Sequence, residues 1–128
     1  MKTKFTELKQ IFDTLHGPKG CLWDKKQTHK TLVKYLREEA EEFIHEVKKG
    51  DYHKMQEELG DILLQVMFHS QIAKKQSRFT IEDVMDTLIK KLKRRHPHVF
   101  GKVKVRSSNE ITRNWNKIKK LEKKVAAR

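Results

Sequence analysis

The residues of this sequence best suited to chemistry are carboxylates in two short clusters, residues 38–42 and 57–61. In each cluster two acids are spaced three residues apart, so each pair shares one face of a helix. These four acids are Glu39, Glu42, Glu58 and Asp61. Carboxylates gathered in one small volume cannot all stay ionised without a cation. Because oxygen ligands favour a hard ion, the predicted cation is Mg²⁺, with Mn²⁺ as a second possibility.

The segment between the two clusters predicts a turn that would bring them together. Residues 48–51 read Lys-Lys-Gly-Asp, which is typical of a helix end followed by the cap of a new helix. Counted from Gly50, the inner acid of each pair lies eight residues away and the outer acid eleven, on both sides. If the two arms are helical and pack antiparallel, the four carboxylates come level with one another across the hairpin.

Hydrophobic periodicity predicts a helix for each arm, over about residues 28–49 and 52–75. One edge of the apolar stripe on the first arm carries Glu39, Glu42 and Glu46, whereas Glu38, Glu41 and His45 fall on its far side. The second arm is apolar almost all round over residues 62–68, which predicts a central, buried helix. Carboxylates at the edge of a buried stripe need a partner or a metal.

The remainder of the chain predicts further helices and an all-α class. Helical spacing occurs over about residues 3–15, after Thr80 as far as Pro97, and after the capping box that begins at Ser107. Only five glycines and two prolines occur, and no β-type alternation is present. We expect one domain over residues 1–128, a bundle of four or five helices built on the hairpin, with residues 117–128 as a basic helical tail.

The net charge of +13 is unevenly distributed along the chain. Residues 38–61 contain nine of the 17 acids, and residues 88–128 contain 15 of the 30 lysines and arginines. A basic half together with an acidic metal cluster suits a polyanionic small ligand carried with its metal, such as a nucleoside triphosphate. High basicity also permits nucleic-acid binding, and a solvated tail is the simpler interpretation for residues 117–128 alone.

The sequence also bears on the compartment. It contains one cysteine, Cys21, which excludes an intramolecular disulfide framework and fits a reducing environment. No apolar stretch approaches the length of a membrane span, and no signal-peptide pattern occurs at the N-terminus. We therefore expect a cytoplasmic protein that does not associate with a membrane.

The acidic pattern, Glu38-Glu39-x-x-Glu42 followed by Glu58-x-x-Asp61, resembles the EExxE…ExxD motif of the MazG-type, all-α nucleoside triphosphate pyrophosphohydrolases. Further similarity lies in the Gly-Cys-Leu-Trp-Asp segment from residue 20, in Gly-Asp-Ile-Leu from residue 60, in Arg-Arg-His-Pro-His-Val-Phe at residues 94–100, and in Trp115-x-x-Ile118-Lys119. The resemblance covers nearly the whole chain.

The resemblance implies an Mg²⁺-dependent hydrolase that converts a nucleoside triphosphate into the monophosphate and pyrophosphate. It also implies a cellular role in nucleotide-pool housecleaning. It implies that the four paired acids are metal ligands and that the protein is a dimer or a pair of dimers. The substrate-binding residues it implies are Lys54, which contacts phosphate, the basic pair Lys91 and Arg95, and Trp115 at the nucleotide. Glu38, beside the ligands, is a candidate to orient or deprotonate water, or else a solvated surface residue.

Two other classes compete with this interpretation. A ferritin-like di-iron protein needs Glu-x-x-His on two helices, but Glu42-x-x-His45 supplies it once and the second acidic pair ends in Asp61. A basic helical nucleic-acid-binding protein would account for the charge of +13. It would leave the half-buried acids unexplained, because they repel phosphate unless a metal is bound.

Overall fold

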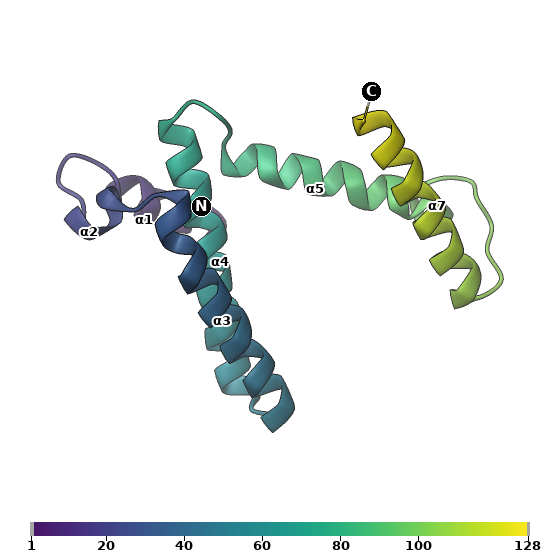
Figure 1. The fold of residues 1–128 in the computed structure, drawn as a ribbon, viewed down its shortest axis with the longest axis horizontal. Helices are drawn as coiled ribbons and strands as arrows, with labels where there is room; N and C mark the ends of the chain where they lie inside the picture. Colours follow the sequence, from purple (N-terminus) through teal and green to yellow (C-terminus); the bar gives the residue numbers. More distant parts are fainter. Residues whose placement is uncertain (1, 128) are drawn as a thin grey trace. The chain divides into compact units, whose positions relative to one another are not determined.

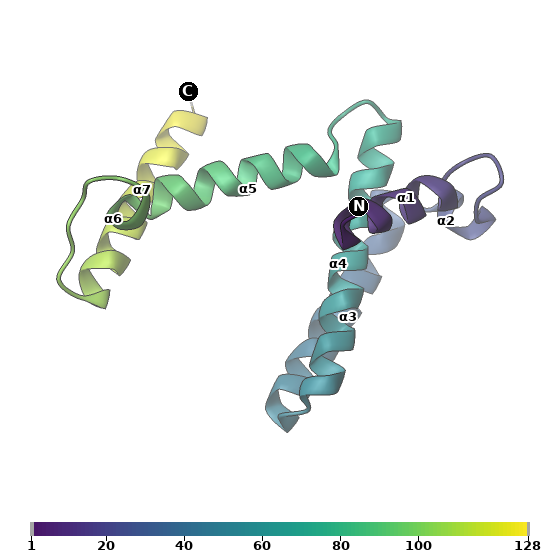
Figure 2. The ribbon, with the colours of Figure 1, turned by 180° about the vertical axis from the view of Figure 1, so that it is seen from behind.

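The computed structural model describes residues 2–127, and every regular element in that range is a helix (Figure 1; Figure 2 shows the reverse side). The elements are α1 (Lys4–Leu15), α2 (Leu22–Lys26), α3 (His29–Lys49), α4 (Tyr52–Lys75), α5 (Ile81–Arg95), α6 (Pro97–Phe100) and α7 (Ser108–Ala126). The predicted all-α class is confirmed. The short helices α2 and α6 were missed, because a single turn shows no repeat of an apolar pattern.

The chain divides into two compact units, the first ending at Ile81 and the second beginning at Glu82. The predicted single domain over residues 1–128, and the packing of all long helices into one bundle, stay predictions. Within the described range no helix combines the length and the hydropathy needed to cross a membrane.

The first unit is built on a helical hairpin of α3 and α4, which lie side by side in both ribbon views. At the start of α3 the Thr28 hydroxyl accepts a hydrogen bond from the Thr31 amide, and the Thr31 hydroxyl accepts one from the Thr28 amide. The reversal between the helices depends on Gly50, whose φ of 72° is left-handed and favours glycine. Asp51 then caps α4 by accepting from the Lys54 amide.

The hydrophobic core of this unit lies at the end of the hairpin opposite Gly50. It consists of Phe12, Leu32, Met67, Phe68 and Ile72, and Phe5, Leu8, Tyr35 and Ile81 pack against it. The rings of Phe12 and Phe68 meet edge to face with centroids 6.2 Å apart. Such aromatic pairs stabilise a core by more than their buried area alone. The two helices of the hairpin are therefore held together by the core with α1 at one end and by the Gly50 turn at the other.

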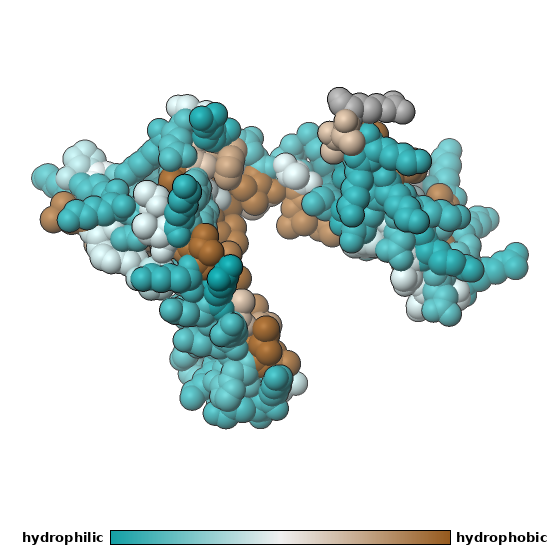
Figure 3. Space-filling model, viewed as in Figure 1, coloured by the Kyte–Doolittle hydropathy of each residue, from teal (hydrophilic) through white to brown (hydrophobic). Residues whose placement is uncertain are grey.

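The second arm of the hairpin is less buried than its sequence indicated. Within residues 62–68, Gln65, Met67 and Phe68 are buried, but the side chains of Leu63, Leu64 and Val66 are exposed. Apolar residues of α3 are exposed as well, among them Val33, Leu36, Ile44 and Val47. Figure 3 shows apolar surface along the hairpin. The expectation of a helix buried all round was wrong for this chain alone, because α3 and α1 cover only part of the circumference of α4.

In the second unit, ion pairs and an aromatic ring link α5 to α7. The guanidinium groups of Arg94 and Arg95 both donate to the carboxylate of Glu122, with the Arg95 Nη2–Glu122 Oε1 distance at 2.8 Å. Arg95 also lies over the ring of Trp115, 5.4 Å from its centroid. The Ser107 hydroxyl caps α7 by accepting from the Glu110 amide, as the sequence predicted. Trp115 and Glu122, two turns apart on α7, thus both contact Arg95 at the end of α5.

Two histidines of the first unit, His16, which is buried, and His69, which is partly buried, predict a pH-dependent stability. Burial lowers the pKa of His16 and of His69 below the ordinary value of 6.5. The nearby Lys75 also lowers the pKa of His16, and His29, whose Nδ1 lies 2.8 Å from that of His69, lowers the pKa of His69. Since the unfolded chain takes up these protons first, the free energy of unfolding should fall as pH drops below about 6.5.

Urea denaturation of the metal-free wild type and of His16→Gln at pH 7.5 and pH 5.5 tests this dependence. We expect the wild type to lose more stability than the variant between the two pH values, because glutamine does not titrate. Contributions from the carboxylates are common to both proteins and cancel in the comparison. An equal loss in both would contradict the assignment to His16.

Candidate metal and substrate site

Three of the four predicted metal ligands meet in the middle of the hairpin. Glu39 comes from α3, and Glu58 and Asp61 come from α4, one turn apart. One carboxylate oxygen from each lies within 4.8 Å of the others, and all three residues are partly buried. Oxygens at this spacing, all from carboxylates, suit a hard divalent cation. Glu39 and Asp61, which are both eleven residues from Gly50 in the sequence, thus lie close together across the hairpin.

The fourth predicted ligand, Glu42, lies one turn after Glu39, outside that group of three. It nonetheless belongs to the same electrostatic site, because its side chain hydrogen-bonds to Glu58 and its charge acts on both Glu39 and Glu58. Glu42 is exposed, so its side chain has room to turn.

The raised pKa values of Glu39 and Glu58 indicate that these carboxylates repel one another and favour a nearby positive charge. Burial, the hydrogen bond to Glu58 and the charges of Asp61 and Glu42 raise the pKa of Glu39 to about 7. Burial raises the pKa of Glu58 too, although the hydrogen bond with Glu39 opposes the increase. One buried oxygen each of Glu39 and Glu58 has no hydrogen-bond partner within residues 2–127. A proton at Glu39 thus occupies the role that a cation would fill, so the donor set fits Mg²⁺ or Mn²⁺.

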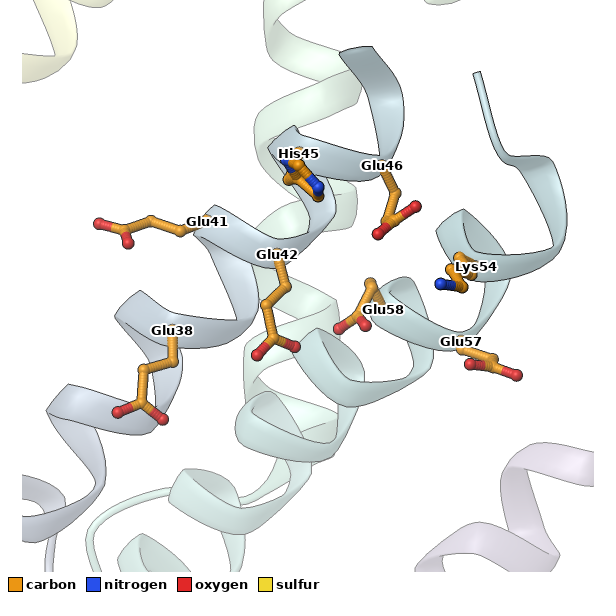
Figure 4. A pocket seen from close by; sticks show the side chains of 8 residues that line it. All are labelled: Glu38, Glu41, Glu42, His45, Glu46, Lys54, Glu57 and Glu58. Carbon is orange, nitrogen blue, oxygen red and sulfur yellow. The ribbon is translucent and has the colours of Figure 1, made fainter. Parts of the chain in front are cut away.

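An open pocket of about 540 Å³ adjoins this group on the side towards the Gly50 turn (Figure 4). Its lining consists of Glu38, Glu41, Glu42, His45, Glu46, Lys54, Glu57 and Glu58. Two residues predicted for chemistry and phosphate contact, Glu38 and Lys54, therefore share one pocket with the predicted ligands Glu42 and Glu58. Glu38 is exposed, so its role in orienting water stays a prediction.

Glu46 is one of four lining residues that the sequence analysis did not assign to the site, the others being Glu41, His45 and Glu57. It is 8% exposed, the most buried of the acids in the pocket. A signal was present, because Glu46 falls with Glu39 and Glu42 at the edge of the apolar stripe of α3. The acidic motif ends at Glu42 and therefore does not contain Glu46. Glu46 lies four residues after Glu42, one turn further along the same face of the helix.

The remaining predicted substrate residues lie in the second unit. Lys91 and Arg95 are one turn apart on α5 and both are partly buried, as is Trp115 on α7. The Arg95 side chain, 16% exposed, is already engaged by Glu122 and by the Trp115 ring. The sequence did not indicate this pairing, because Glu122 lies 27 residues further along the chain. Their contact with substrate stays a prediction.

Comparison with known proteins identifies the relatives of this chain. The model of the MazG nucleotide pyrophosphohydrolase domain matches residues 27–100. The chain is 50% identical over 119 residues to the nucleoside triphosphate pyrophosphohydrolase/pyrophosphatase MazG of Thermotoga maritima, covering 93% of this chain and 45% of that protein. It is 48% identical over 120 residues to the uncharacterized protein YabN of Bacillus subtilis, covering 94% of this chain and 24% of YabN.

The Escherichia coli K12 nucleoside triphosphate pyrophosphohydrolase is 39% identical over 114 residues, which are 88% of this chain and 43% of that protein. The chain thus spans between about a quarter and a half of the length of these curated relatives. A crystal structure of a mazG-related protein from Thermotoga maritima superposes with a TM-score of 0.71 at 29% identity, covering 88% of this chain and 96% of that one.

The residues matched by the family model contain the whole hairpin and all the carboxylates of the site, together with Lys54, Lys91 and Arg95. Trp115 and Glu122 lie beyond them. The match exceeds half of the sequence, and the site residues within it occupy the geometry described above. This chain therefore belongs to the MazG nucleotide pyrophosphohydrolase domain family.

Proposed function

We propose that the protein hydrolyses nucleoside triphosphates to the monophosphate and pyrophosphate in a reaction that requires Mg²⁺, with Mn²⁺ as an alternative ion. The observation that carries the proposal is the meeting of Glu39, Glu58 and Asp61, with carboxylate oxygens within 4.8 Å and a pKa of about 7 at Glu39. The names of the relatives from Thermotoga maritima and Escherichia coli support it. Clearing unwanted nucleotides from the cellular pool is the role we propose for this activity.

In this proposal each group has a distinct task. Glu39, Glu58 and Asp61, together with Glu42, would hold the ion, which when bound neutralises phosphate charge and acidifies a water. Glu38 orients the attacking water from the pocket wall, and Lys54 contacts the phosphates. The second unit supplies Lys91 and Arg95 to the departing pyrophosphate and Trp115 to the nucleotide. Charge stabilisation and positioning are the main demands of phosphoryl-transfer chemistry.

A panel of canonical and modified triphosphates tests the reaction and its specificity. Monophosphate and pyrophosphate should appear in equal amounts with Mg²⁺ present, and EDTA should stop their release. Turnover of no triphosphate, combined with a nucleic-acid gel shift that collapses with salt, would instead favour the basic helical nucleic-acid-binding protein.

The exposed apolar side chains of the hairpin predict self-association. Leu63, Leu64 and Val66 on α4 and Val33 and Leu36 on α3 lose contact with water only if another surface covers them. We propose a homodimer, or a tetramer built from two dimers, with a large apolar interface on the hairpin. Light scattering at micromolar concentration should give at least twice the mass of one chain. A monomer under these conditions would contradict the prediction.

We also propose a cytoplasmic location. Cys21 is a free thiol at the start of α2, as expected for a reducing compartment. The proposed substrates occur in the same compartment.

A further inference from the structure

The last helix, α7, carries a row of positive charges along one face. Its members are Arg113, Lys117, Lys120 and Lys124, and we call them the basic row. Their intervals of four, three and four residues place them in line along the helix. All four side chains are exposed, whereas the residues at positions 111, 115, 118 and 122, on the opposite side of α7, are partly buried. Figure 3 shows mainly hydrophilic side chains over α7.

The basic row faces away from α5. On the opposite side of α7, Glu122 pairs with Arg95 of α5 at 2.8 Å, and the Arg95 guanidinium lies 5.4 Å from the centroid of the Trp115 ring. The row is therefore separate from Arg95 and Trp115, the residues of this contact that we propose to bind the nucleoside triphosphate.

Within residues 2–127 no carboxylate pairs with the basic row. The two acids of α7 are engaged elsewhere. Glu122 accepts from Arg94 and Arg95. Glu110 accepts a hydrogen bond from the Arg106 amide. In the part of the chain that the structure describes, the charges of the row thus lie at the surface without a partner.

The basic row lowers the stability of the helix that carries it. Like charges three or four residues apart on a helix repel one another. The helix dipole offsets this repulsion only in the last turn, whose basic residues are Lys123 and Lys124. The other three cations of the row gain nothing from the dipole, so a bound anion would stabilise them.

The length and composition of the basic row favour the phosphate backbone of a nucleic-acid duplex. From Arg113 to Lys124 the row extends roughly 16 Å, at about 1.5 Å per residue, which is further than the phosphates of one triphosphate reach. A duplex carries one negative charge per about 1.7 Å of its axis and presents several phosphates over this length. The row contains no aromatic ring on which the bases of a single strand would stack. A membrane-bound helix would turn its apolar face to lipid, whereas that face of α7 contacts Arg95 through Trp115.

We propose that the basic row of α7 binds the phosphate backbone of a nucleic-acid duplex without preference for sequence. Lysine and arginine contacts to phosphate fix position and carry no sequence information. This binding is additional to the proposed hydrolysis of triphosphates and uses none of its residues.

Fluorescence anisotropy of labelled DNA and RNA duplexes of one sequence, with the full chain in EDTA, tests the proposal. For the wild type, the logarithm of the association constant should fall linearly with the logarithm of salt concentration, with a slope of roughly −3 to −4 for four phosphate contacts. The triple variant Lys117→Gln/Lys120→Gln/Lys124→Gln should bind at least about tenfold more weakly at about 100 mM salt, and its slope should be shallower by about one per lysine removed. The relative affinities for the two duplexes show which one the row prefers.

The matched control is Lys26→Gln/Lys48→Gln/Lys49→Gln, which removes the same charge from exposed positions of the first unit and should bind as the wild type does. Equal losses in the two triple variants would mean that binding reflects net charge alone and would overturn the proposal. So would the absence of duplex binding at about 50 mM salt, or a row variant that loses binding to phosphatidylserine vesicles but keeps binding to duplexes.

Pyrophosphate release by the row variant separates this proposal from the proposed function. Circular dichroism establishes that the variant is helical. We expect its activity with Mg²⁺ to stay within about twofold of the wild type while its duplex binding is lost. A wild type that binds duplexes through the row but hydrolyses no triphosphate upholds the surface and overturns the function. A wild type that hydrolyses triphosphates but binds no duplex does the reverse.

Discussion

Glu39→Gln is expected to abolish the release of pyrophosphate and, at the same time, to stabilise the metal-free protein. Activity should fall at least about 100-fold, because the variant lacks one of the three converging carboxylates that we propose as ligands. Stability should rise because the folded protein no longer holds a carboxylate next to Glu58 and Asp61. The two opposite effects have one cause, because the clustered carboxylates repel one another until positive charge is bound.

The sign of the stability effect follows from the pKa of Glu39, which rises from 4.5 to about 7 on folding. A raised pKa means that this carboxyl favours the folded state only while it is protonated. Its contribution is complete below pH 4.5 and is lost as pH increases through about 7. The variant should therefore exceed the wild type by roughly 1 kcal/mol at pH 8, after allowance for solvent screening, and the difference should vanish near pH 4.

Urea denaturation with EDTA at pH 8 and pH 4 measures this difference, and pyrophosphate release with Mg²⁺ measures activity. Asp61→Asn should lose activity to the same extent. The matched control is Glu57→Gln, since Glu57 lies on α4 beside Glu58 but is exposed and pairs with His53 at 3.3 Å. Full activity in Glu39→Gln or Asp61→Asn would refute the assignment of the metal ligands.

Lys54→Ala and Arg95→Ala are each expected to slow pyrophosphate release by about 10²–10³, equivalent to roughly 2–4 kcal/mol of transition-state stabilisation. Lys54 lines the pocket with the proposed ligands Glu42 and Glu58, so its ammonium group can reach phosphates bound there. Arg95 is held by Glu122 and by the ring of Trp115, which gives its guanidinium a fixed direction. A fixed donor loses little entropy when a phosphate arrives.

The control for these variants has to respect the contact between α5 and α7. Cutting the basic tail after Leu121 removes positive charge, but it also removes Glu122 and releases Arg94 and Arg95. Lys120→Gln is the cleaner comparison, because Lys120 is exposed on the same helix and its change preserves Glu122. We expect its activity to remain within about twofold of the wild type.

Steady-state rates at saturating substrate, together with denaturation midpoints, separate a role in the reaction from a role in holding α5 to α7. Arg95→Lys retains the charge but cannot form the same two-pronged contact with Glu122, so it should recover part of the rate. If Lys120→Gln abolished activity while Arg95→Ala had no effect, the basic half of the chain would serve a different partner.

The sequence by itself determined the features that depend on neighbouring residues. Both ends of α3 and the start of α4 follow from the Thr28 cap, the left-handed Gly50 and the Asp51 cap, each of which acts within one turn of the chain. The opposition of Glu39 and Asp61 also follows from local rules, since two regular helices that leave one turn keep residues at equal distances level. For this reason counting from Gly50 indicated, before any packing was known, that Glu39, Glu58 and Asp61 would lie close together.

Tertiary structure alone decided which side chains are covered and which charges are paired. The burial of Glu46 depends on where α4 lies against α3, and the exposure of Leu63 and Val66 depends on how little of α4 the neighbouring helices cover. The Arg95–Glu122 pair joins positions on two helices separated by an irregular connection. Periodicity reports only the face of a helix, whereas the contacts of that face depend on the position of its neighbours in space.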